Sequence, residues 1–105
     1  MMILVFSSSR CPHCPKAVRA VKKVAPEYAD KGVSYRKIRS KTPEGKKLAL
    51  RYGVRSLPTI LLLDDEGGEL KRIVGAVETH QLRSKLEGVL NPRKTLRDVL
   101  GSLIR

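Results

Sequence analysis

The chain reads FSSSRCPHC from Phe6 to Cys14, and this stretch organises the rest of the sequence. The residues before it, 2–6, form a continuous apolar run, as expected of a strand buried on both faces. The residues after it carry apolar side chains at helical spacing: Ala17, Val18, Val21, Val24, Ala25 and Tyr28. The two cysteines therefore lie where a buried strand passes into a helix.

This position favours thiol chemistry. We expect Cys11 to lie at or just before the helix N-terminus, where free backbone N–H groups and the helix dipole stabilise a thiolate. Cys14 follows one turn later and can attack a mixed disulfide formed at Cys11. Pro12 and Pro15 suit the first turn of a helix, where their missing N–H matters little. The pattern predicts a redox-active pair with Cys11 and Cys14 as the catalytic residues.

His13 lies between the cysteines and, when protonated, further favours a Cys11 thiolate. We therefore expect the pKa of Cys11 to fall well below the free value of about 8.5. Since a stabilised dithiol form makes the disulfide a stronger oxidant, the couple should lie above about −270 mV, a value typical of strongly reducing protein dithiols.

A metal site is the alternative explanation for the two cysteines. A structural zinc site needs four ligands, and the chain adds only His13 and His80. We therefore predict no metal ion and no bound cofactor. No basic, export-type leader precedes the apolar run, which suggests a reducing, cytoplasmic setting where paired cysteines are more often catalytic than structural.

The remaining segments predict an α/β fold. A charged edge strand is expected at 33–39, and Thr42, Pro43 and Gly53 mark the two ends of the next helix. An apolar strand at 59–63 and a turn at 64–68 lead into an antiparallel partner at 69–74, and a helix opens at Glu78 or Thr79. The order β-α-β-α-β-β-α predicts a four-stranded mixed sheet with helices on both faces.

Residues 91–105 form a separate pattern. Asn91-Pro92 breaks the preceding helix, and an apolar stripe follows at helical spacing: Leu96, Val99, Leu100, Leu103 and Ile104. We interpret 1–90 as the domain and 91–105 as its amphipathic helical extension, packed on that domain. Dimerisation, a partner groove or an anionic membrane surface are the other uses of such a helix.

The chain is strongly basic, with 22 Lys and Arg against 10 Asp and Glu and a formal charge of +12. The basic residues are spread along the whole sequence, which favours a solvated basic surface. We expect the protein to be a monomer. Nucleic acid is not an expected partner, because one Phe and three Tyr provide no platform for stacked bases. A basic binding module with incidental cysteines is the alternative. The apolar runs are too short to span a membrane.

Three segments carry a resemblance to a known family. FSSSRCPHC resembles the active-site segment of thioredoxins and glutaredoxins, and residues 52–59, YGVRSLPT, look like the segment that carries their cis-proline. Val74-Gly75-Ala76, followed by Gln81-Leu82, is similar to the end of the last strand and start of the last helix in thioredoxins. The resemblance runs collinearly over residues 2–90.

The resemblance implies a thioredoxin-like fold and a thiol–disulfide oxidoreductase acting on protein disulfides, with a reductase or glutathione as electron donor. It implies that Pro58 is cis and packs against the disulfide, whereas the sequence alone favours a trans proline opening a strand. Leu57 would pair with the substrate main chain, and Gly75 and Ala76 would form another wall of the substrate-binding groove.

The chain also departs from these relatives. Arg10 replaces the tryptophan expected before the first cysteine, and Val5 replaces the buried aspartate that serves thioredoxin as proton acceptor. A glutathione-dependent glutaredoxin is the alternative enzyme. In that enzyme Lys16, Arg10 and Arg55 could attract the carboxylates of glutathione. However, Gly67-Gly68 lies in the hairpin between the last two strands, and glutaredoxins contact a glutathione carboxylate with residues that follow those strands.

Overall fold

The computed structural model describes residues 1–90. The elements, in chain order, are β1 Met2–Ser7, α1 Cys14–Glu27, a 3-10 turn Ala29–Lys31, β2 Ser34–Arg39, α2 Pro43–Tyr52, β3 Thr59–Leu63, β4 Glu69–Val74 and α3 Thr79–Leu90. The expected order of strands and helices is confirmed. The helix expected within 91–105 lies outside the described residues. No helix of residues 1–90 has the length and apolar character needed to cross a membrane.

The sheet has the strand order β2-β1-β3-β4. β1 runs parallel to β2 and antiparallel to β3, and β4 returns antiparallel to β3. The two apolar strands, β1 and β3, therefore occupy the centre, and the charged β2 lies at an edge as expected. Phe6 pairs with Thr59, and Thr59 pairs with Val74, so the end of β1, the start of β3 and the end of β4 meet at one end of the sheet.

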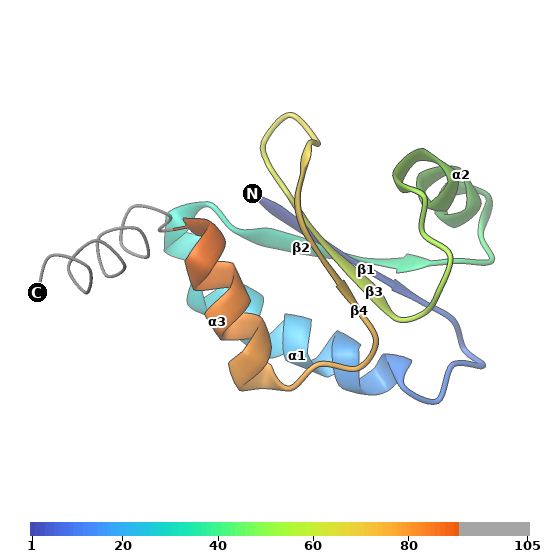
Figure 1. Cartoon of the computed structure of the whole chain (residues 1–105), viewed down its shortest axis with the longest axis horizontal. Coiled ribbons are helices and arrows are strands. Elements are labelled where there is room, and N and C mark those ends of the chain that lie inside the picture. The colour runs from blue at the N-terminus through green and yellow to red at the C-terminus, as the bar shows by residue number, and fades with distance from the viewer. Residues whose placement is uncertain (91–105) are drawn as a thin grey trace, which may run out of the picture.

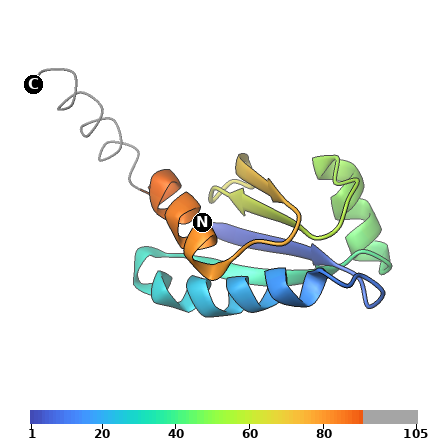
Figure 2. The same ribbon diagram turned by 60° about the horizontal axis from the view of Figure 1, so that its bottom comes forward.

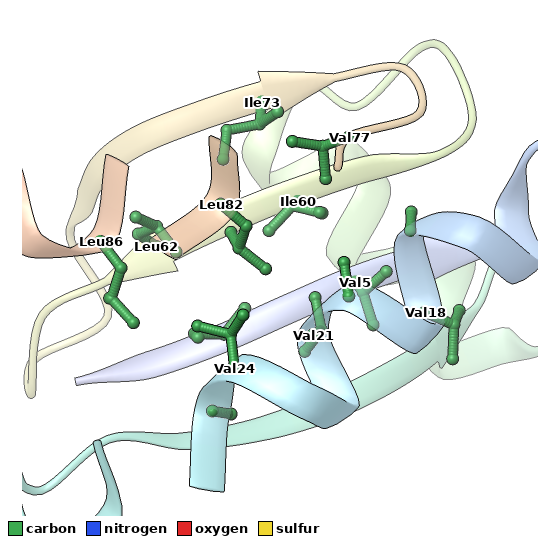
Figure 3. Close-up of a cluster of buried hydrophobic side chains, with 14 of the residues drawn as sticks. Val5, Val18, Val21, Val24, Ile60, Leu62, Ile73, Val77, Leu82 and Leu86 are labelled. Carbon is green, nitrogen blue, oxygen red and sulfur yellow. The ribbon is translucent and has the colours of Figure 1, made fainter. Parts of the chain in front are cut away.

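Helices cover both faces of the sheet, with α1 and α3 on one side and α2 on the other (Figure 1). Successive residues of β1 alternate between two cores, since side chains along a strand point to opposite faces. Ile3 and Val5 join the core under α1 and α3, where Figure 3 shows Val21, Val24, Leu82 and Leu86 gathered against the sheet, whereas Leu4 and Phe6 join the core under α2.

The ends of α2 follow the sequence signals. The Thr42 Oγ1 accepts a hydrogen bond from the Gly45 N–H at 3.0 Å, and Pro43 occupies the first turn. Gly53 ends the helix with a φ of 64°, in the left-handed region that glycine adopts without strain.

The end of α1 comes before the first glycine that follows it. Gly32 is the residue type that commonly ends a helix, but the α-helix ends at Glu27. Pro26 lies in the last turn and lacks the N–H needed there. The chain therefore tightens into the 3-10 turn Ala29–Lys31, which Gly32 closes with a φ of 81°.

Polar contacts join the C-terminal end of α1, away from the cysteines, to α3. The Tyr28 hydroxyl donates a hydrogen bond to Glu87 Oε1 at 2.7 Å, and Arg83 pairs with Glu27 at 2.6 Å. Burial, followed by the bond to Glu87, raises the pKa of Tyr28 to about 12, so the phenol keeps its proton and this hydrogen bond well into the alkaline range. These contacts hold α3 against the helix that begins with Cys14.

Candidate active site

The two cysteines form a disulfide in the structure. The bond joins Cys11 to Cys14, whose Cα atoms are 5.4 Å apart, well within the range that a disulfide spans. The predicted pairing of the cysteines is therefore present, at the end of the sheet where β1 stops.

The start of α1 differs from the expectation. The helix begins at Cys14, with His13 as its N-cap residue, so Cys11 and Pro12 precede it. The backbone turns twice between Ser7 and Cys14, and the Cys11 N–H donates to the Ser8 carbonyl at 3.2 Å. Pro15 takes the first-turn position that the sequence assigned to both prolines. The loop needs these turns because it leads the chain from the end of β1 to α1, which packs on one face of the sheet.

The two cysteines differ in exposure. Cys14 is the first residue of α1 and retains only 2% of its surface, whereas Cys11, in the preceding loop, is half-buried. Disulfide exchange requires an approach to the attacked sulfur along the bond. Cys11 is therefore the member of the pair that a second protein can reach.

The residues assigned to a substrate groove lie at the same end of the sheet. The Leu57–Pro58 peptide bond is cis, and the Gly75 N–H donates to the Pro58 carbonyl at 2.9 Å. This bond joins the segment before β3 to the segment after β4, and Gly75 takes a φ of 95° to make the turn. The segments that carry Leu57, Pro58, Gly75 and Ala76 thus meet at the end of the sheet where β1 stops and the loop to the cysteines begins.

His13 and Pro12 are both exposed beside the disulfide. His13 is the N-cap residue of α1, but its side chain makes no capping hydrogen bond to a helix amide. Within the described residues its imidazole also pairs with no acidic side chain. The ring therefore lies between the two cysteines in the chain, with its side chain open to solvent.

A buried proton acceptor is absent from the expected position. Val5 is 1% exposed and packs in the core under α1. The buried polar residues of the described chain are Ser7 and Thr59, and the Thr59 hydroxyl already donates to the Ser56 carbonyl at 2.7 Å. Within residues 1–90, no three His, Cys, Asp or Glu side chains gather as a metal would require.

Of the three cations that the sequence offered for glutathione, Lys16 is already paired. Its ammonium group contacts the carboxylate of Glu78, the residue before α3, and this hydrogen bond lowers the pKa of Glu78. Arg10 and Arg55 are exposed. None of the three lines the large hollow beside the disulfide.

That hollow, of about 560 Å³, is bounded by both cysteines and by cationic residues that no motif of the sequence indicated. Its charged lining comes from α1, β2 and the loop after β2: Arg19, Lys37, Arg39 and Lys41. The alternation of side chains along β2 could have indicated two of these cations. Ile38 is buried in the core under α2, so its neighbours Lys37 and Arg39 point to the opposite face of the sheet, toward α1.

Comparison with known proteins gives a consistent answer. A family model described as a thioredoxin-like domain matches residues 1–90. A probable thioredoxin of Archaeoglobus fulgidus is 36% identical over 81 residues, covering 70% of this chain and 86% of that protein. A thioredoxin of Methanocaldococcus jannaschii is 39% identical over 64 residues, covering 60% and 71%.

A solved structure described as that of a malarial protein superimposes with a TM-score of 0.72 at 25% identity, covering 85% of this chain and 96% of that one. The similarity to known proteins therefore includes the arrangement of strands and helices as well as the sequence. The chain belongs to the thioredoxin-like domain family, and its Cys11–Cys14 pair makes it a thiol–disulfide oxidoreductase.

Proposed function

We propose that the protein reduces disulfides of other proteins, with Cys11 as the attacking residue and Cys14 as the resolving residue. The unequal exposure of the two sulfur-bearing residues supports this division of roles, since the half-buried Cys11 is open to a substrate and the buried Cys14 is not. The curated relatives named above are thioredoxins, which favours protein substrates and a dedicated reductase as electron donor. We place the reaction in the cytoplasm, with glutathione as the alternative donor.

The reaction begins from the dithiol form. The Cys11 thiolate attacks one sulfur of the substrate disulfide, forming a mixed disulfide and releasing the other substrate sulfur as a thiolate. Cys14 then loses its proton and attacks the Cys11 sulfur, which forms the Cys11–Cys14 bond and releases the second substrate thiolate. Two electrons pass to the substrate, and a dithiol donor restores them to the protein.

The neighbouring residues position the partners. The substrate main chain would pair with Leu57 beside the cis-proline Pro58, and Gly75 and Ala76 would close the opposite wall. Their placement at one end of the sheet, linked by the bond from Gly75 to Pro58, supports this groove. A protonated His13 would favour the Cys11 thiolate by its charge.

An insulin-reduction assay tests the proposal. The protein should accelerate precipitation of insulin chains in dithiothreitol well above the rate with dithiothreitol alone, because the protein turns over through its own dithiol. Replacing dithiothreitol by glutathione with glutathione reductase identifies the donor class. A rate equal to that of dithiothreitol alone, with the protein folded and its thiols reduced, would refute the assignment of protein disulfides as substrates.

A further inference from the structure

The hollow beside the disulfide has walls that are fixed by the fold. β1 and β2 are parallel and end as the pair Ser7 and Arg39, so the loops that follow them emerge at the same end of the sheet. Figure 2 shows the loop after β1 and the start of α2 at this end. Grooves for ligands commonly form outside the carboxyl ends of parallel strands.

Hydrogen bonds hold the loop after β2 in place. The Ser40 N–H donates to the Ser7 carbonyl at 2.9 Å, and the Thr42 hydroxyl donates to the Arg39 carbonyl at 2.8 Å. Gly45 allows α2 to approach, because a Cβ there would overlap the Arg39 carbonyl. The wall is therefore formed before any ligand arrives, which reduces the entropy lost on binding.

The charge of the hollow is uncompensated within the described chain. Four of its lining residues are cationic and none is acidic: Arg19, Lys37, Arg39 and Lys41. Residues 1–90 form ion pairs elsewhere, including Arg36 with Glu44 and Lys16 with Glu78, but no ion pair or side-chain hydrogen bond involves these four cations. The like charges repel one another, and an anionic partner would relieve that repulsion.

We propose that this hollow is a specificity site for acidic side chains that flank the target cysteine of a substrate protein. The inference rests on the proposed function, because the same hollow is bounded by Cys11 and Cys14. A peptide segment in mixed disulfide with Cys11 would have its neighbouring residues at the mouth of the hollow. Glu or Asp there would meet guanidinium and ammonium groups that are solvated but unpaired.

A segment of a protein fits this hollow better than a free anion does. The lining includes the apolar Val18 and Pro15 beside the cations, a mixture suited to a peptide's aliphatic and carboxylate groups together. The volume, about 560 Å³, lies in the range of pockets that bind drug-sized ligands and exceeds what a small inorganic anion needs. The groove at Leu57 and Pro58 would hold the other part of the same segment.

Two disulfide-linked peptides, identical except for Glu or Gln on both sides of the cysteine, provide the test. The reduced protein should reduce the Glu peptide with a kcat/KM about tenfold higher at low salt, and the advantage should shrink as ionic strength rises. The triple variant Arg19→Gln, Arg39→Gln, Lys41→Gln should lose most of this ratio. The control Lys46→Gln, Lys47→Gln, Lys71→Gln removes the same charge from exposed positions outside the hollow and should keep the ratio.

The outcomes separate the two claims. Equal rates for both peptides, or equal loss of the ratio in both triple variants, would overturn the acidic specificity and leave the oxidoreductase function standing. Failure to reduce either peptide would overturn both. Circular dichroism of both triple variants verifies that each comparison is made between folded proteins.

Discussion

Replacing Cys11 by Ser should lower insulin reduction by a factor of about a thousand or more, because a hydroxyl neither ionises near neutral pH nor attacks a disulfide sulfur. The fold should be retained, since Cys11 lies in a loop and is only half-buried. The rate of insulin precipitation, corrected for the rate with dithiothreitol alone, measures the loss.

Cys14→Ser is the matched control for Cys11→Ser, since it makes the same substitution at the other cysteine. It should also fail to turn over, but the mixed disulfide at Cys11 should persist because nothing resolves it. Mass spectrometry under non-reducing conditions would detect the trapped adduct. An adduct formed by Cys11→Ser and not by Cys14→Ser would reverse the two roles.

Replacing Leu82 by Ala should lower the free energy of unfolding by about 2–5 kcal/mol, the range for deleting a buried leucine side chain. Leu82 is fully buried and brings α3 into the core that it shares with α1 (Figure 3). Loss of its side chain leaves a cavity between α3 and the sheet. Urea denaturation at neutral pH measures the change.

Leu50→Ala provides the comparison for Leu82→Ala. Leu50 lies on α2 and is 85% exposed, so the same truncation removes little buried surface, and the free energy of unfolding should change by less than about 0.5 kcal/mol. Equal destabilisation by both substitutions would contradict the assignment of Leu82 to the core.

Much of the fold follows from local signals in the sequence. The continuous apolar runs of β1 and β3 predict central strands because only a central strand buries both faces, and the structure buries both. Helix α2 begins after Thr42 and ends before Gly53 as expected, because helix capping depends only on residues that are close in the chain. The cysteine pair was recognisable for the same reason, because its residues are close in the chain.

The features that were missed depend on contacts between distant segments. The start of α1 at Cys14 and not nearer Cys11 reflects the path of the loop from the sheet end, which no residue of the motif encodes. The sequence offers Lys16 as a partner for glutathione carboxylates, but the fold places it against Glu78. The cationic hollow joins α1 to β2 and to the loop after it, so its residues are neighbours only in the folded chain.

A redox titration tests the central claim most directly. The protein is equilibrated in glutathione or dithiothreitol buffers of graded potential, and its free thiols are counted by alkylation and mass spectrometry. We expect one two-electron transition in which Cys11 and Cys14 appear together as thiols, with a midpoint above about −270 mV. A midpoint at or below that value would contradict the effect assigned to His13, and a protein whose cysteines stay unpaired at every potential would contradict the redox function itself.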